Sequence, residues 1–443
     1  MQQMCQKLRQ MRQKLGNRNV PEERPPSPIQ FGEAVAATCI SAIGDAGGRY
    51  GLPYLFVGPK MLKGKSMCTT SVNVVRIATK GPGDVSGMLS LIEQGKIDPK
   101  SIVAILGKTE GNGGVNDFTR EYAVSALSAA LAPYVDLPPH RVEQRIGFVM
   151  SGGTEGVLSP HITVFTRNGV ANRGSEAVSG KRLSIGMAQT RDFLPEELGR
   201  SPQIRETARA VTAAMADAAI VDPQDVHFVQ IKCPLLTSDR VEAAAARGNR
   251  TVTNSAYGSM AYSRGASALG VAVALREIEG EIDDKSVLSR FDFFSSVAST
   301  SAGIELMHNV VIVLGNSTSS AAPFEIGHAV MRDAIDSTAV IKALNSVGLH
   351  IEDGSGPVTA SRQLVNIFAK AEASPNGSIR GFRHIMLEDT DISSTRHARA
   401  AVGGLIAGLS GTGAIYVSGG AEHQGPPGGG PVAVIARLSN SSG

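Results

Sequence analysis

The sequence predicts an α/β protein that contains three similar α/β units. Three kinds of segment recur in the same order: an apolar run that ends in lysine, an Ala/Gly-rich stretch with an arginine, and a strand-like run that ends in serine. The recurring lysines and serines are unevenly spaced, which favours homologous units with variable loops over a solenoid of fixed period. We place the units at residues 71–175, 176–320 and 321–443.

The first recurring segment is a predicted buried strand. Short continuous apolar runs are typical of strands that are covered on both faces. Each run would deliver a lysine at its C-terminal end. The runs are residues 101–108, 226–232 and 364–370, and their last residues are Lys108, Lys232 and Lys370.

The second recurring segment is a predicted helix with an arginine near its start. A Ser or Thr precedes each arginine and is a suitable N-cap, which would place the arginine in the first helical turn. A cation there opposes the helix macrodipole, so its repeated presence indicates a ligand requirement and not helix stability. The arginines are Arg120, Arg264 and Arg396.

The third recurring segment carries the pattern Ser-(Gly/Ala)-Gly-x-Glu. Because glycine has no Cβ, backbone N–H groups in such a turn can approach a small ligand and stabilise a developing oxyanion. One such element could arise by chance, but three elements in one order argue against it. The serines and the residues that follow them are Ser151–Gly152, Ser301–Ala302 and Ser418–Gly419.

These residue types indicate nucleophilic chemistry without a triad histidine. A serine hydroxyl needs a base, and a lysine can be that base when burial or a neighbouring cation lowers its pKa. The planar guanidinium of arginine suits carbonyl or anionic oxygens. Three Lys/Arg/Ser sets around one centre would bind a small planar ring with repeating carbonyl and N–H edges, and one serine would attack a ring carbon.

Composition and local motifs exclude several other classes. The 443 residues carry a formal charge of +3, which argues against a nucleic-acid partner, and no apolar run is long enough to cross a membrane. The four cysteines have no framework spacing, so we expect a reducing, cytoplasmic compartment. Ile102 stands where a phosphate loop needs glycine, and Val149 stands where a nucleophile elbow needs one.

Residues 1–70 differ from the rest of the chain. A basic segment with apolar residues on one helical face precedes a Pro/Gly-rich linker. It is either an organelle-targeting presequence or a frayed amphipathic extension. We favour the extension because serine, common in such presequences, is absent before Ser27.

Several of these segments resemble the cyanuric acid amidohydrolase/barbiturase family over about residues 71–438. The resemblance is carried by Gly107-Lys-Thr-Glu-Gly-Asn-Gly, Asn116-Asp-Phe-Thr-Arg-Glu-Tyr, Met150-Ser-Gly-Gly-Thr-Glu-Gly-Val-Leu-Ser-Pro-His161, Lys232-Cys-Pro-Leu-Leu, Tyr262-Ser-Arg-Gly-Ala-Ser-Ala-Leu-Gly and Ser418-Gly-Gly-Ala-Glu-His-Gln-Gly. It implies a barrel of three α/β units around a pseudo-threefold axis, with a central active site. It also implies hydrolysis of the s-triazine ring of cyanuric acid to carboxybiuret, which loses carbon dioxide to give biuret.

The resemblance also implies roles for individual residues. Ser301 matches the nucleophile and Lys232 its base, and Ala302 in place of glycine is consistent with a unit specialised for chemistry. The matching substrate-binding residues are Arg120, Arg264 and Arg396, the pairs Ser151–Gly152 and Ser418–Gly419 beside Ala302, and the remaining lysines, Lys108 and Lys370.

The family further implies a structural divalent cation and a homotetramer, whereas no redox cofactor is expected. A carboxylate with amide and backbone carbonyl oxygens is a hard-oxygen site suited to Mg²⁺ or Ca²⁺, although a turn without an ion is the alternative. The matching residues are Glu372, Ala421, Gln424, Gly425, Pro426 and Gly429.

Two alternative functions stay open at this stage. The first is barbiturase, whose substrate lacks the threefold equivalence of cyanuric acid and therefore suits three arginines less well. The second is a binding protein for a cyclic imide with an inert serine. Ser301→Ala separates an enzyme from such a binder.

Overall fold

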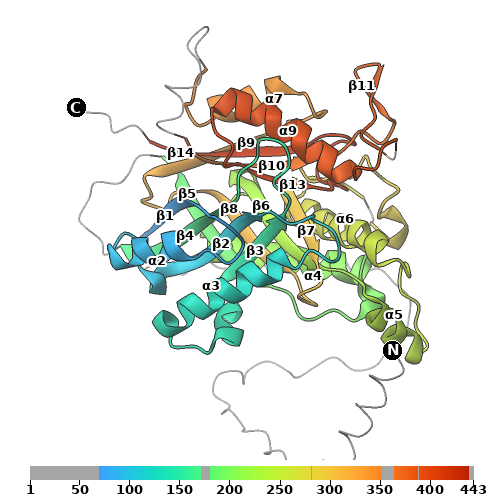
Figure 1. The fold of residues 1–443 in the computed structure, drawn as a ribbon, viewed down its shortest axis with the longest axis horizontal. Coiled ribbons are helices and arrows are strands. Elements are labelled where there is room, and N and C mark those ends of the chain that lie inside the picture. The colour runs from blue at the N-terminus through green and yellow to red at the C-terminus, as the bar shows by residue number, and fades with distance from the viewer. Residues whose placement is uncertain (1–68, 171–179, 281, 352–363, 388, 439–443) are drawn as a thin grey trace, which may run out of the picture. The chain divides into compact units, whose positions relative to one another are not determined.

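The structure is a computed structural model that describes residues 69–170, 180–280, 282–351, 364–387 and 389–438. The predicted N-terminal extension lies outside these residues except for Thr69 and Thr70, which already belong to the first strand. The chain is α/β, as the sequence predicts, with helices interspersed among the strands (Figure 1).

Three four-stranded sheets form the framework, each from one stretch of sequence. We refer to residues 69–170, 182–317 and 324–437, with their helices, as the first, second and third sheet segments. The first contains β1 (Thr69–Ala78), β2 (Ile102–Thr109), β3 (Gly147–Gly152) and β4 (His161–Val170). The second contains β5 (Arg182–Gln189), β6 (Val226–Pro234), β7 (Ala298–Gly303) and β8 (Val310–Ser317). The third contains β9 (Phe324–Met331), β10 (Leu364–Ala371), β13 (Tyr416–Gly419) and β14 (Gly430–Arg437).

All three sheets have the same strand order and directions. The orders are β1-β4-β2-β3, β5-β8-β6-β7 and β9-β14-β10-β13. In each sheet the second and third strands along the chain are parallel, and the other neighbours are antiparallel. A small hairpin is formed by β11 (Ser378–Ile379) and β12 (Phe382–Arg383). Strand pairing among the described residues does not join the sheets into a closed barrel.

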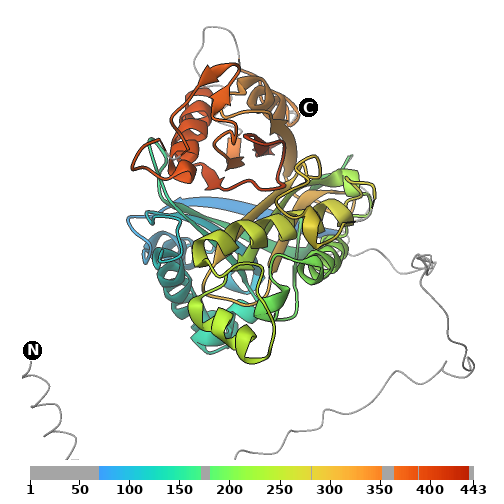
Figure 2. The ribbon, with the colours of Figure 1, turned by 90° about the vertical axis from the view of Figure 1, so that its right-hand side faces the viewer.

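Helices cover one face of each sheet. In the third segment α7 and α9 pack on β9 and β13, and in the second α4 and α6 pack on β5 and β7 (Figures 1 and 2). The helices are α2 (Ser86–Glu93), α3 (Thr119–Val135), α4 (Ser201–Asp217), α5 (Ser238–Ala246), α6 (Ala256–Ala274), α7 (Ser337–Asn345) and α9 (Ser394–Ser410). Short 3₁₀ turns are η1 (Pro99–Ser101), η2 (Pro139–Gln144), η3 (Pro195–Glu197), η4 (Pro223–Asp225) and η5 (Asp284–Ser286).

The opposite faces of the three sheets share one hydrophobic core. Phe165, Phe228 and Tyr416, one from each segment, surround Phe368 at ring-centroid distances of 6.3, 5.0 and 5.8 Å. The sheets are thus buried on both faces, which explains why the lysine-ended strands are apolar without alternation. The predicted strands before Lys108, Lys232 and Lys370 are present as β2, β6 and β10.

The predicted helix N-caps are wrong. The capping positions are Phe118, Ser255 and Ser393, and of these only the Ser255 side chain accepts a hydrogen bond, from Gly258 N. Helix α6 therefore begins more than two turns before Arg264, because the residues upstream of it are also compatible with a helix. Arg120 and Arg396 do lie in first turns.

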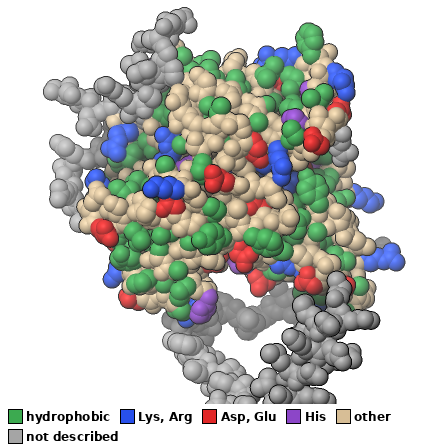
Figure 3. Space-filling view, in the orientation of Figure 1, with side chains coloured by type: hydrophobic (Ala, Val, Ile, Leu, Met, Phe, Trp, Pro, Cys, Tyr) green, Lys and Arg blue, Asp and Glu red, His purple; other side chains and the backbone are tan. Residues whose placement is uncertain are grey.

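The surface agrees with the near-neutral composition. On the face drawn in Figure 3, basic and acidic side chains are interspersed and form no large basic patch. Within the described ranges, no helix combines the length and hydrophobicity needed to cross a bilayer.

Candidate active site

The recurring lysines and serines are direct neighbours in the three sheets. Lys108 is aligned with Ser151, Lys232 with Ser301, and Lys370 with Ser418, each on adjacent parallel strands. Aligned residues on neighbouring strands project from the same face of a sheet. The fold therefore repeats one lysine–serine arrangement three times.

A single pocket collects the serines of all three sheet segments, and we call it the central pocket. Its wall also contains the residue after each serine and one arginine from each of α3, α6 and α9. The lining residues are Gly113, Arg120, Ser151, Gly152, Met260, Arg264, Ser301, Ala302, Arg399, Ser418 and Gly419. The structure thus brings together three hydroxyl groups and three guanidinium groups around one cavity.

Close packing behind the pocket explains the glycine after Ser151. A Cβ at Gly152 would lie 1.7 Å from Asp117 Oδ2 and 3.0 Å from Gly113 N. The Asp117 carboxylate is held there because it accepts a hydrogen bond of 2.8 Å from Gly113 N. Only glycine lets the loop approach this closely, whereas the second sheet segment has room for Ala302.

Two of the pocket arginines are oriented by glutamates from another sheet segment. Arg264 Nε donates to Glu422 Oε2 at 2.8 Å, and Arg399 Nε donates to Glu155 Oε2 at 2.8 Å. Burial raises the pKa of Glu422, but the charge and hydrogen bonds of Arg264 outweigh it, so this pKa stays below its usual value. These glutamates are the last residues of the Ser-(Gly/Ala)-Gly-x-Glu motif. The sequence alone assigned no role to the glutamates.

The first arginine follows the same cyclic pattern but finds a different acceptor. Arg120 donates to the backbone oxygen of Ala302 at 3.0 Å and to that of Gly114 at 2.8 Å. The glutamate that would be its partner by analogy, Glu305, instead pairs with Lys232. The second sheet segment therefore departs from the other two.

Arg399 takes the place that the sequence predicted for Arg396. Arg399 is buried, lines the central pocket and binds Glu155, whereas Arg396 is half-buried and is not part of the pocket wall. The two residues are three apart on α9, and alignment on the preceding Thr395 selects the one that lies outside the pocket wall. Residues 400–404 are Ala-Ala-Val-Gly-Gly, and a similar small-residue tract follows Arg264, so this signal could have distinguished Arg399 from Arg396.

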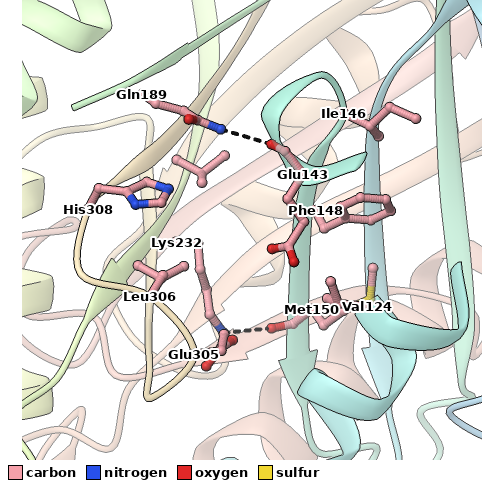
Figure 4. Close-up of a pocket in the computed structure, with 11 residues that line it drawn as sticks. Val124, Glu143, Ile146, Phe148, Met150, Gln189, Lys232, Glu305, Leu306 and His308 are labelled. Atoms are coloured by element: carbon pink, nitrogen blue, oxygen red, sulfur yellow. Dashed lines mark hydrogen bonds and ion pairs between the residues drawn. The ribbon is translucent and has the colours of Figure 1, made fainter. Parts of the chain in front are cut away.

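Two of the three lysines contact their own serines. Lys108 Nζ donates to Ser151 Oγ at 3.1 Å, and Lys370 Nζ donates to Ser418 Oγ at 3.1 Å. Lys232 Nζ instead lies 2.7 Å from Glu305 Oε1 and donates to the backbone oxygen of Met150 at 3.2 Å (Figure 4). The two residues of the predicted catalytic pair, Lys232 and Ser301, are thus register partners on neighbouring strands, while the amine of Lys232 contacts Glu305.

All three lysine amines are buried, and burial lowers their pKa values. Desolvation lowers the pKa of Lys108 well below its usual range and the pKa of Lys370 to about 7. It also lowers the pKa of Lys232, although the Glu305 carboxylate acts in the opposite direction. A neutral amine near physiological pH is what a general base requires.

Lys232 and Glu305 also line a second pocket, which we call the side pocket. Figure 4 shows Glu143, Phe148 and His308 around the same space. Burial and the nearby Glu305 charge raise the pKa of Glu143. Lys232 therefore lines this side pocket, whereas its register partner Ser301 lines the central pocket.

Glu372 and the loop between β13 and β14 have the donor types of a hard-cation site. Gly428 N donates to Glu372 Oε2 at 2.9 Å, and burial raises the pKa of this carboxyl to about 7. A bound cation would offset that desolvation. Gln424 Oε1 already accepts from Thr300 N at 2.7 Å, so Gln424 would contribute its backbone oxygen. Ala421, Gly425, Pro426 and Gly429 lie in the same loop.

Comparison with known proteins identifies the family. A model described as "Amidohydrolase ring-opening protein" matches residues 73–437. A relative from Bradyrhizobium diazoefficiens, named cyanuric acid amidohydrolase, is 76% identical over 374 residues, which are 84% of this chain and 100% of the relative. A relative of the same name from Pseudomonas sp. (strain ADP) is 56% identical over 367 residues, 83% of this chain and 99% of the relative.

Solved structures agree with these relatives. A structure described as a cyanuric acid hydrolase that arose by structural concatenation has a TM-score of 0.80 and 55% identity, and covers 84% of this chain and 100% of its own. The cyanuric acid hydrolase of A. caulinodans has a TM-score of 0.76 and 48% identity, with 84% and 99% covered. This chain therefore belongs to the family of ring-opening amidohydrolases.

Proposed function

We propose that this protein is a cyanuric acid amidohydrolase, and that its three sheet segments are homologous units around a pseudo-threefold axis through the central pocket. The observation that carries the proposal is the matched set of three serines and three arginines in one cavity. Cyanuric acid repeats a carbonyl and an N–H group three times around a planar ring. Donors that recur three times around a cavity complement this symmetric ring. They complement a ring with one dissimilar edge, such as barbituric acid, less well.

Ser301 is the proposed nucleophile and Lys232 its base. The amine of Lys232 would leave Glu305 and contact Ser301 Oγ, on the residue that is its register partner. It then accepts the hydroxyl proton as Oγ forms a bond to a ring carbonyl carbon. The ring C–N bond then breaks, and the nitrogen takes the proton from Lys232. Water hydrolyses the resulting serine ester, which restores the hydroxyl and releases carboxybiuret. Carboxybiuret then loses carbon dioxide to give biuret.

The asymmetry of the second sheet segment supports this assignment. Lys232 is the lysine of the three that is paired with a carboxylate, while Lys108 and Lys370 contact their own serines. A lysine that exchanges partners suits repeated proton transfer. Lys108 and Lys370 would instead fix the ring-contact serines Ser151 and Ser418. Arg120, Arg264 and Arg399 would bind the ring carbonyls.

A structural cation and a homotetramer complete the proposal. Glu372 and the backbone oxygens of the β13–β14 loop would hold Mg²⁺ or Ca²⁺, which would fix the loop that follows Ser418. Every step of the ring opening is a proton transfer or a substitution at carbon, so the proposed chemistry uses no redox cofactor. The expected compartment is the cytoplasm.

Turnover of cyanuric acid by the purified protein tests the proposal. We expect loss of ring absorbance with formation of biuret, and a much lower rate with barbituric acid. Ser301→Ala should abolish turnover but still bind cyanuric acid in calorimetry. Turnover of barbituric acid alone would identify a barbiturase, and binding without turnover in the wild type would identify a cyclic-imide-binding protein.

A further inference from the structure

The proposed nucleophile contacts a serine from another sheet segment. Ser301 Oγ lies 3.0 Å from Ser418 Oγ. Ser418 Oγ in turn accepts a hydrogen bond of 3.1 Å from Lys370 Nζ. A chain of three polar groups therefore ends on the oxygen atom that would attack the ring.

The acceptors around Lys370 give this chain a direction. Lys370 Nζ donates to the backbone oxygens of Thr300 at 2.8 Å and Gly419 at 3.1 Å, and to Ser418 Oγ. In its protonated form Lys370 has three N–H donors and no acceptor, so below its lowered pKa of about 7 these three oxygens use its full capacity. Because Ser418 Oγ accepts from the lysine, its own O–H is left to donate. Ser301 Oγ lies at hydrogen-bonding distance from it.

We propose that Ser418 is a positioning residue for Ser301, and that its hydroxyl donates to Ser301 Oγ as the nucleophile loses its proton. This bond orients Oγ and stabilises the negative charge that develops on it. The inference rests on the proposed function, in which Lys232 accepts the Ser301 proton. Ser418 keeps its own O–H bond throughout, so no additional proton is transferred.

Burial makes this hydrogen bond effective. Ser301 is 7% exposed and Ser418 is 2% exposed, and water therefore does not compete freely for either hydroxyl. A preorganised donor in such a site stabilises charge more strongly than it would in water. Ser418 would thus act on Ser301 in addition to contacting the ring.

Ser151 provides a matched control within the same chain. Ser151 lines the central pocket, is aligned with its own lysine and accepts a hydrogen bond of 3.1 Å from Lys108. Among the described residues, no hydrogen bond joins Ser151 to Ser301. Ser151→Ala therefore removes a pocket hydroxyl without removing a direct contact to the nucleophile; the Tyr416 hydroxyl interacts with both serines and is unchanged in this variant.

The experiment compares Ser418→Ala, Ser418→Thr and Ser151→Ala in steady-state turnover of cyanuric acid. We expect Ser418→Ala to lower kcat by about 10²–10³-fold, which is the effect of losing one preorganised donor. Ser418→Thr keeps the hydroxyl and should recover most of kcat. Ser151→Ala should chiefly raise KM.

Binding measurements separate the action on Ser301 from the contact with the ring. In the Ser301→Ala background, Ser418→Ala and Ser151→Ala should weaken the affinity for cyanuric acid by similar factors in calorimetry. Equal losses of kcat for the two alanine variants, or a threonine variant as slow as the alanine variant, would overturn the positioning role. Should the alanine variant not fold, Ser418→Cys, a weaker donor of similar shape, should lower kcat with little change in KM.

Failure of the proposed function itself has a different signature. The wild-type protein would then not hydrolyse cyanuric acid at all. An active wild type with indifferent Ser418 variants refutes only the positioning role.

Discussion

The assignment of Arg399, and not Arg396, as the third pocket arginine can be tested sharply, because the two residues lie on one helix. Arg399→Ala removes a guanidinium from the central pocket and leaves Glu155 without its ion-pair partner, whereas Arg396→Ala removes a half-buried side chain outside the pocket. We expect Arg399→Ala to lower kcat/KM by about 10²–10³-fold, or about 2.7–4 kcal/mol, as for the loss of one preorganised donor. Arg396→Ala should lower it less than about threefold, or about 0.6 kcal/mol.

Stability should change in the same order. Breaking a fully buried ion pair costs about 3–5 kcal/mol, because one charge remains buried and unpaired. The Glu155 side chain is 20% exposed, so water partly solvates the remaining carboxylate and we expect a loss nearer to 2–3 kcal/mol, roughly. Chemical denaturation measures this loss, and Glu155→Gln combined with Arg399→Ala should recover part of it. An Arg396→Ala variant as inactive as Arg399→Ala would refute the assignment.

Three further predictions concern the pH profile, the cation and the packing behind the pocket. Since the base must be neutral, kcat/KM should rise with pH through the lowered pKa of Lys232. The Glu305 carboxylate raises this pKa, so Glu305→Gln should move the rise in kcat/KM to lower pH. A shift to higher pH would contradict the role of Lys232. Added Mg²⁺ or Ca²⁺ should raise Tm in thermal denaturation. The increase in Tm should grow as the pH rises through about 7, because Glu372 then loses its proton. Glu372→Gln should remove the effect of the cation. Gly152→Ala should destabilise the protein by about 1–3 kcal/mol, because the added Cβ would meet Asp117. Ala302→Gly should retain the fold. A Gly152→Ala variant as stable as the wild type would show that the loop adjusts freely.

The sequence predicts most of the framework because repetition strengthens each local signal. An apolar run before Lys108 alone is ambiguous, but the same run before Lys232 and Lys370 identifies a strand in each segment, and the structure has β2, β6 and β10 at these positions. The helix starts were not predictable in this way. Residues 256–263 are as compatible with a helix as those after Arg264, so the Ser before the arginine is no boundary.

The individual side-chain pairs around the pocket could not be predicted from the sequence. Nothing in the order of residues along the chain indicates that Glu422 meets Arg264, or that Glu305 meets Lys232, because these pairs depend on how the sheets pack and on side-chain rotation. Arg399 was missed for a related reason: helical spacing, and not the residue before the arginine, determines which side chain reaches the pocket.

The cyclic pairing of arginines with glutamates has a consequence for how such a protein can change. Arg264 and Arg399 are each oriented by a glutamate of another segment, so neither Glu422 nor Glu155 can change without disturbing the arginine that it orients. In a trimer of identical subunits, any substitution would appear at all three positions at once. Within one polypeptide, Glu305 binds a lysine while Glu155 and Glu422 keep their arginines. Covalent linkage thus permits one segment to differ while the other two keep the arginine–glutamate pairing.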